Sequence, residues 1–152
     1  MKKAVCKLDP KPFAQIAFVV KNVAKTSKAY AELFGLPVPK WQLTDGMDKA
    51  HTEYKGKPSK AKAKISFFVI GNIMMELIQP VGGPSTWKDH LDTRGEGLHH
   101  IAFMVKDMDA HIKFLKSKKV PLIQKGDFEG GRYAYLDGQK NLNVVLELLE
   151  TF

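Results

Sequence analysis

The sequence predicts an α+β fold of two tandem βαβββ modules, because it contains an internal repeat whose two copies order their elements alike. Residues 15–22 (QIAFVVKN) resemble residues 100–107 (HIAFMVKD), and five of these eight positions are identical. Towards the end of each half, residues 73–79 (IMMELIQ) resemble residues 144–150 (VVLELLE). Self-similarity of this kind indicates that one supersecondary unit occurs twice. The first copy is longer, and its additional residues fall in the polar stretch 42–64.

Short apolar runs rich in β-branched and aromatic residues predict the strands of both modules. These strands are expected over residues 15–20, 65–70 and 73–78 in the first half, and over residues 100–105, 132–136 and 143–149 in the second. Gly71 and Asn72 form a tight-turn signal between two of them. Residues 80–97 are rich in turn-forming residues and are interpreted as the connector between the halves.

One helix follows the opening strand of each module. The first is predicted over residues 24–34, with Asn22 as its N-cap and Gly35 as its C-terminal stop. The second is predicted over residues 109–118, where Asp107 can cap. Apolar side chains recur on one face of each segment, which is typical of a helix that packs on a sheet.

Strand alternation assigns the repeated residues to faces of the sheet. The bulky side chains at positions 16, 18 and 20, and at 101, 103 and 105, share one face and are expected to pack on the helices. The other face carries Gln15 and His100 at equivalent positions of the two halves. Glu76 and Glu147 are equivalent in the same way, so the sequence predicts two symmetry-related pairs of polar side chains.

We expect residues 1–152 to form one domain, with module one at about 12–80, a connector at about 81–97 and module two at about 98–150. A chain of this length buries a core without disulfides or structural metals. Its one cysteine excludes an intrachain disulfide and fits a cytoplasmic protein. We find neither a signal peptide nor an apolar run long enough to cross a membrane.

The formal net charge of +8 allows a nucleic acid, an anionic small molecule or plain solubility as its explanation. The lysines are scattered except for one cluster at positions 55, 57, 60, 62 and 64. No nucleic-acid-binding motif accompanies them, and we expect no nucleic-acid partner. The cluster is interpreted as a solvated face, with contact to a phosphate or carboxylate of a substrate as the alternative.

Four residues at duplicated positions, Gln15, Glu76, His100 and Glu147, have side chains that donate to metals. The two glutamates interrupt apolar strands, and buried carboxylates usually pair or bind a cation. If the halves pack with approximate twofold symmetry, all four converge on one divalent ion. Oxygen and imidazole donors without thiolate suit zinc, nickel, cobalt, manganese or iron(II). Taken singly, each residue has an ordinary structural interpretation, and the duplication favours the metal site.

These features resemble the vicinal oxygen chelate superfamily, which includes glyoxalase I, methylmalonyl-CoA epimerase, bleomycin-resistance proteins and extradiol dioxygenases. The resemblance rests on residues 95–103 (GEGLHHIAF), 76–80 (ELIQP) and 147–150 (ELLE), and it covers about residues 12–150. It implies a curved mixed sheet around a metal and, in relatives, a homodimer. His100, Glu76 and Glu147 fall on the family's ligand positions, and Gln15 stands at a position that some glyoxalases fill with glutamine.

The resemblance implies a metal-dependent isomerase, epimerase or lyase of the glyoxalase I type, acting on a small carbonyl or thioester compound that can be anionic. The reaction would move a proton next to a carbonyl through a metal-stabilised enolate or enediolate. Glu147 is the expected base, because this position supplies it in related glyoxalases. Glu76 is the symmetry-related candidate for a second proton-transfer group.

Other interpretations remain open at the level of sequence. A methylmalonyl-CoA epimerase carries a second catalytic glutamate ahead of the third strand of its first module, whereas residues 57–64 here contain no carboxylate. A drug-binding resistance protein usually lacks a complete ligand set. A dioxygenase usually has two histidines and one carboxylate, which Gln15 does not match.

Three features near the expected site have two interpretations each. Strand alternation points His99 away from the site, so a structural role is favoured. Residues 125–133, with paired glycines, are interpreted either as a hairpin connection or as a cover over the substrate. Trp87 in the connector is open to both a structural and a substrate-contacting role.

Overall fold

Residues 4–152 are described by the computed structural model, and they fold around one mixed sheet. The strands are β1 (Phe13–Val19), β2 (Gln42–Leu43), β3 (Glu53–Tyr54), β4 (Lys57–Pro58), β5 (Lys62–Ile70), β6 (Ile73–Val81), β7 (Gly97–Met104), β8 (Leu122–Phe128), β9 (Gly131–Leu136) and β10 (Val145–Thr151). The helices are α1 (Val23–Phe34), α2 (Met47–Ala50), α3 (Thr86–Arg94), α4 (Met108–Ser117) and α5 (Gln139–Leu142). The strand order is β2-β5-β6-β1-β7-β10-β9-β8-β3-β4.

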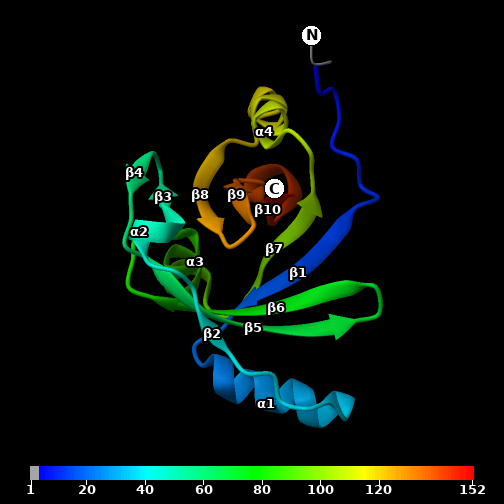
Figure 1. Ribbon diagram of the computed structural model, residues 1–152, viewed down its shortest axis with the longest axis vertical. Helices are drawn as coiled ribbons and strands as arrows, with labels where there is room; N and C mark the ends of the chain where they lie inside the picture. Colours follow the sequence, from blue (N-terminus) through cyan, green and yellow to red (C-terminus); the bar gives the residue numbers. More distant parts are fainter. Residues whose placement is uncertain (1–3) are drawn as a thin grey trace.

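The sheet curls so that its two halves face each other, with α1 and α4 on the outside of the curve (Figure 1). Strands β1 and β7 pair antiparallel at its centre, and each pairs in parallel with the closing strand of its own half, β6 or β10. This arrangement confirms the predicted α+β fold with a curved mixed sheet.

The two long helices begin and end close to the predicted residues. Asn22 accepts a hydrogen bond from the backbone N–H of Lys25, and Gly35 ends α1 in the left-handed conformation that favours glycine. Asp107 caps α4 by accepting from the backbone N–H of Ala110. The caps expected from the sequence are therefore confirmed.

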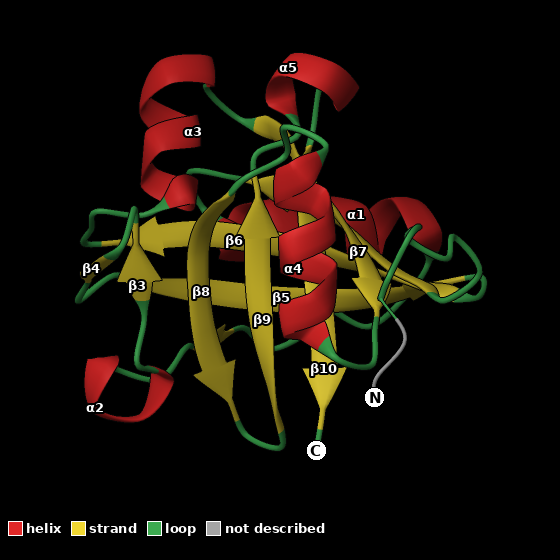
Figure 2. Cartoon of the chain, turned by 90° about the horizontal axis from the view of Figure 1, so that it is seen from above, coloured by secondary structure: helices red, strands yellow, loops and turns green. Residues whose placement is uncertain are grey.

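The bulky strand face packs on these helices, as predicted. Ile16 and Phe18 of β1 lie in a core cluster with buried residues of α1, including Val23 and Ala31. The corresponding side chains of β7 pack in a second cluster with Met108 and Leu115 of α4. In Figure 2, α4 crosses the outer face of the sheet. Within residues 4–152 no helix is long and apolar enough to span a membrane.

The additional residues of the first half connect the two edges of the sheet. Strand β2 pairs with β5 at one edge, after which the chain passes through α2 to β3, which pairs with β8 in the other half. The pairing places Glu53 opposite Lys125. Two-residue strands such as β2 and β3 exist because a neighbouring strand pairs with them, and local propensity is too weak to predict them. This segment therefore closes the open side of the curved sheet.

The connector and the last strand need correction, and the structure bears out the hairpin interpretation of residues 125–133. The connector at 80–97 contains helix α3, which Ser85 caps by accepting from the backbone N–H of Lys88. Strands β8 and β9 pair over most of residues 125–133. The last strand begins at Val145 because Asn143 ends the short helix α5 with a left-handed backbone, φ 59°.

Candidate metal centre and substrate cavity

The register of the four central strands brings the predicted donors together. Ala17 of β1 pairs with Glu76 on one side and with His100 on the other. Ala102 of β7 pairs with Glu147 on one side, and Gln15 pairs with it on the other. Paired residues point to the same face, and neighbouring strands lie about 4.8 Å apart. Two fully buried alanines thus separate the four side chains and leave space between them.

Glu76, His100 and Glu147 form a tight buried cluster on this face. The Nε2 atom of His100 lies 3.0 Å from a carboxylate oxygen of Glu147 and 3.4 Å from one of Glu76. Candidate ligand atoms of the three residues all lie within 4.8 Å of one another. Donors bound to one zinc-like ion at about 2.0–2.2 Å lie at most about 4.4 Å apart. The cluster is therefore close to the size that a single divalent cation needs.

Unsatisfied polar atoms indicate that the cluster fits a cation. His100 Nε2 and Glu147 Oε2 are buried, and within residues 4–152 neither has a hydrogen-bond partner of acceptable geometry. Buried polar atoms are nearly always satisfied, so two such atoms 3.0 Å apart need a common partner. A divalent cation would accept electron pairs from both, and the two glutamates would neutralise it formally.

The electrostatics of the cluster also favour a cation between the carboxylates. Burial lowers the pKa of His100, but the nearby carboxylates of Glu147 and Glu76 outweigh burial and raise this pKa to about 9. Burial raises the pKa of Glu76 above its usual range. A proton on His100 therefore supplies the positive charge that balances the carboxylates, and a metal ion would replace that proton.

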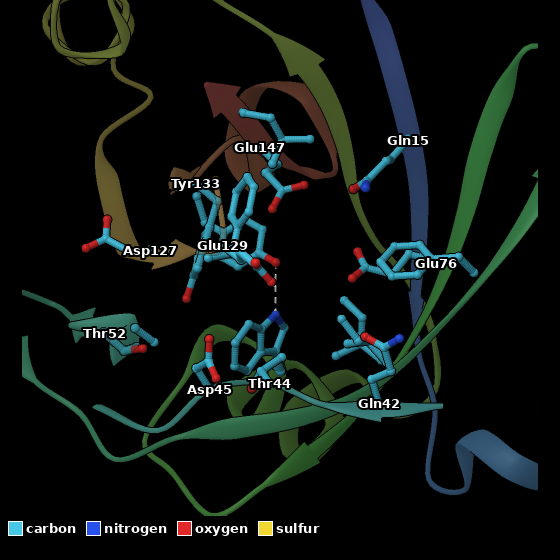
Figure 3. A pocket seen from close by; sticks show the side chains of 18 of the residues that line it. Gln15, Gln42, Thr44, Asp45, Thr52, Glu76, Asp127, Glu129, Tyr133 and Glu147 are labelled. Carbon is cyan, nitrogen blue, oxygen red and sulfur yellow. Dashed lines mark hydrogen bonds between the residues drawn. The ribbon is translucent and has the colours of Figure 1, made fainter. Parts of the chain in front are cut away.

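Gln15, the fourth predicted ligand, lines the same cavity as Glu76 and Glu147. Figure 3 shows its side-chain amide pointing towards the space between the two carboxylates. An amide oxygen is a neutral donor that complements two carboxylates and one imidazole. The structure therefore brings all four predicted residues to one region.

His99 has a more direct connection to the cluster than the sequence indicates. It does not line the cavity of the cluster, as strand alternation predicts, but its Nδ1 lies 2.9 Å from Nδ1 of His100. Its Nε2 lies 3.1 Å from the hydroxyl oxygen of Thr86. Burial lowers the pKa of His99 well below its usual value, so this ring is neutral. These contacts link His100 through His99 to Thr86.

A cavity of about 600 Å³ opens over the cluster. Its walls come from β1, β5, β6, β7, β8, β9 and β10, from the segment that crosses between the sheet edges, and from α3. Trp87 of α3 lies in this wall and donates from its indole N–H to the hydroxyl of Tyr135, 3.1 Å away. The structure therefore gives Trp87 a substrate-facing position as well as a structural one.

Sequence reasoning missed the two tyrosines of the cavity. Tyr133 and Tyr135 alternate along β9, and both line the cavity. Burial and the nearby carboxylates raise the pKa of Tyr135 well above its usual value, and burial raises that of Tyr133 to about 12. Both tyrosines lie in the predicted strand 132–136, two residues apart and therefore on one face, and this spacing could have indicated them. The structure pairs Tyr135 with Glu147 of the neighbouring strand.

The β8–β9 hairpin contributes to the cavity wall, whereas the lysine cluster does not. The hairpin tip contributes Asp127, Phe128 and Glu129 to the cavity wall, so the segment is both a hairpin and part of the cover. None of the five clustered lysines lines the cavity. Lys64 instead places its ammonium group 4.6 Å from the centre of the Trp41 ring. The solvated-face interpretation fits these positions.

The chain belongs to the Glyoxalase/Bleomycin resistance protein/Dioxygenase superfamily, because the model of that family matches residues 14–135. A relative in Bacillus subtilis, the uncharacterized protein YqjC, is 30% identical over 92 residues. That match covers 59% of this chain and 66% of the relative, so it spans just under two thirds of the relative's length.

Solved structures with the same fold include two kinds of protein. A hypothetical protein from Bacillus halodurans is 23% identical with a TM-score of 0.64, and the match covers 92% of this chain and 94% of that one. Methylmalonyl-CoA epimerase from Mycobacterium tuberculosis is 18% identical with a TM-score of 0.64, covering 96% and 93%. A methylmalonyl-CoA epimerase in complex with methylmalonyl-CoA and NH4+ is 19% identical with a TM-score of 0.63, covering 92% and 94%. These similarities confirm the fold and the family resemblance.

Proposed function

We propose that the protein is a divalent-metal-dependent isomerase, epimerase or lyase of the glyoxalase I type, which moves a proton at a carbon next to a carbonyl. The observation that carries this proposal is a pair of buried atoms without hydrogen-bond partners at the edge of a large cavity, Nε2 of His100 and Oε2 of Glu147. Gln15, Glu76, His100 and Glu147 would hold the ion. When bound, the ion would act as a Lewis acid and stabilise negative charge on the substrate oxygen.

Glu147 is proposed as the base. Its carboxylate is buried, lines the cavity and pairs along the sheet with Tyr135. A base of this kind takes the proton from the carbon and returns it to a neighbouring atom. Glu76 lies on the other side of His100 and is the second proton-transfer group in the proposal.

Tyr135 is proposed to stabilise the oxygen on which charge develops. Its oxygen already accepts the indole N–H of Trp87, which fixes the direction of the hydroxyl. Its raised pKa keeps the group protonated at neutral pH. Within residues 4–152 the Tyr135 proton has no acceptor, so it is free for a substrate oxygen in the cavity. A preorganised donor at such a position lowers the barrier for charge development.

Two related functions are less well supported by the geometry. A two-base epimerase of the methylmalonyl-CoA type would need a second carboxylate from residues 57–64, but Lys57 and Pro58 form β4 at the far edge of the sheet and lie outside the cavity wall. A dioxygenase site usually has two histidines and one carboxylate. The cluster here has the reverse composition.

Metal content and proton exchange test the proposal together. Purified protein is expected to take up one divalent ion per chain, measured by elemental analysis. Glu147→Gln should abolish exchange of the substrate proton with deuterated water while the protein remains folded. Glu150→Gln is the matched control, since Glu150 lies three residues along the same strand and pairs with Arg132 outside the cavity. Protein that binds no divalent ion, or Glu147→Gln with undiminished exchange, would reject the proposal.

A further inference from the structure

The cavity wall has a charge opposite to that of the whole chain. The chain carries a formal charge of +8. Among residues 4–152, the cavity is lined by five carboxylates and by no lysine or arginine; the carboxylates are Asp45, Glu76, Asp127, Glu129 and Glu147. A divalent ion at the cluster would offset Glu76 and Glu147. Asp45 and Glu129 would remain in the wall, whereas the carboxylate of Asp127 contacts the imidazole of His51, whose Nδ1 lies 2.8 Å away, and points away from the cavity in Figure 3.

These remaining carboxylates lie apart from the metal cluster. Asp45 comes from the segment that follows β2, and Glu129 comes from the tip of the β8–β9 hairpin. In Figure 3, Asp45 and Asp127 lie on the opposite side of the cavity from Glu76. Within residues 4–152, only Glu76, His100 and Glu147 are close enough together to hold an ion as a group of three. The spread of the outer carboxylates therefore suits an organic cation better than a second metal ion.

The cavity also has the aromatic side chains that favour an organic cation. Five of them line it: Phe67, Trp87, Phe128, Tyr133 and Tyr135. Ring faces attract ammonium and guanidinium groups, most strongly where water is excluded. Trp87 is only 5% exposed. Glu147, which is 4% exposed and is one of the proposed metal ligands, also lines this cavity, so a ligand beside the aromatic wall would lie next to the ion.

We propose that the part of the substrate entering this cavity carries a positive charge, as an amine, quaternary ammonium or guanidinium group, which Asp45 and Glu129 bind beside the aromatic wall. This inference deepens the proposed function and rests on it. It also departs from the anionic substrate that the net charge suggested, because an anionic group in the cavity would meet carboxylates, and none of residues 4–152 that line the wall is a lysine or arginine. Within residues 4–152, Asp45 and Glu129 have no ion-pair partner, so both are free to bind a ligand.

Three inert thioethers of similar length test the charge preference without turnover. They are S-methylthiocholine, its uncharged isostere 3,3-dimethylbutyl methyl sulfide, and the anionic S-methyl-3-mercaptopropionate. Calorimetric titration of metal-loaded protein should show the cationic probe binding at least about tenfold tighter than the anionic one. Each carboxylate should contribute about three- to 30-fold, the range for one charge pair between water-like and protein-like dielectric at several ångströms. Added salt should weaken the cationic probe only.

The variants locate the effect. Asp45→Asn combined with Glu129→Gln should weaken the cationic probe by about tenfold or more and leave the uncharged isostere unchanged. Glu32→Gln is the matched control, because it changes the net charge in the same direction at an exposed position on α1. Equal binding of all three probes, or an equal loss in the double variant for the uncharged probe, would overturn the proposal. Uptake of a second metal equivalent that the double variant loses would also overturn it, in favour of a second ion site.

Turnover separates this inference from the proposed function. Methylglyoxal adducts of thiocholine, 3,3-dimethylbutane-1-thiol and 3-mercaptopropionate are offered, and exchange of the substrate proton with deuterated water is followed. If kcat/KM for proton exchange is highest with the thiocholine adduct, the result supports both the charge preference and the proposed chemistry. Cation-selective binding with no exchange on any adduct supports the charge preference and counts against the proposed chemistry. Exchange that favours the anionic adduct overturns the charge preference and leaves the chemistry standing.

Discussion

Substituting Ala102 with valine tests whether the donor atoms converge as the sheet register indicates. Ala102 is fully buried, and its strand partners are Glu147 on one side and Gln15 on the other. The two methyl groups that valine adds would lie between these side chains and push them apart. We expect metal affinity to fall by at least about ten- to 100-fold, the effect usually seen when the residues that orient metal ligands are disturbed.

Ala134→Val is the matched control for the cost of overpacking. Ala134 is also fully buried in a strand, but it lies in the core cluster beneath α4. Both substitutions add two methyl groups to a packed interior, which costs about 1–3 kcal/mol of unfolding free energy. For a chain of this size that is a fall in Tm of about 2–12 °C. Calorimetric unfolding should show comparable losses in the two variants.

Metal titration then distinguishes the two variants. Ala134→Val should bind the divalent ion as the unmodified protein does, whereas Ala102→Val should not. The result that refutes the reasoning is an Ala102→Val protein with unchanged affinity and stoichiometry, because the donor atoms would then not meet above this residue. An equal loss of affinity in both variants would also refute it, since the loss would then come from general destabilisation.

Three further predictions follow from the same contacts. His99→Phe should weaken metal binding by about ten- to 100-fold, because His100 loses the partner of its Nδ1, while Thr86→Val should have a smaller effect. Metal at about 100 times its Kd should raise the unfolding free energy by about 2.7 kcal/mol and Tm by about 5–11 °C, and a chelator should reverse the shift. Burial raises the pKa of Glu150, but Arg132 outweighs burial and lowers this pKa below its usual value. The ion pair therefore stabilises the fold at pH values above the unfolded-state pKa of Glu150. This contribution is lost as the pH falls through the folded-state pKa. Urea unfolding should therefore show Arg132→Met less stable than the unmodified protein at pH 7 and equally stable in strong acid.

The sequence predicts which four side chains share one face of the sheet, because strand alternation and the repeat act on the same residues. Alternation places Gln15 and Ala17 on one face, and the repeat assigns His100 and Ala102 to the equivalent face of the second half. The observed pairing of β1 with β7 follows the same symmetry, since Gln15 lies opposite Ala102 and Ala17 lies opposite His100. Gln15 and His100 therefore follow from local pattern together with the expected twofold packing of the halves.

The cavity wall could not be predicted in the same way. Helix α3 has a polar sequence, TWKDHLDTR, in which only Trp87 and Leu91 show the apolar spacing of a helix. The turn-forming residues before it therefore favour a connector over a helix. Strand β8 contains a lysine, a glycine and an aspartate, which weaken any strand pattern. Strand β3 forms because β8 offers it an edge in the other half of the sheet. Long-range pairing of this kind leaves little trace in a single sequence.

This difference indicates how the site divides its tasks. The residues that would hold the metal come from the repeated strands, whereas much of the substrate wall comes from segments without a counterpart in the other half. Thr44, Asp45 and Thr52 belong to the additional segment of the first half, and Trp87 belongs to α3. A change at these four residues should alter which substrate is bound and leave metal affinity intact, because none of them shares a strand with a proposed ligand or contacts His99. The twofold symmetry of the sheet thus explains why the proposed metal ligands meet, and departures from that symmetry explain the composition of the cavity wall beside them.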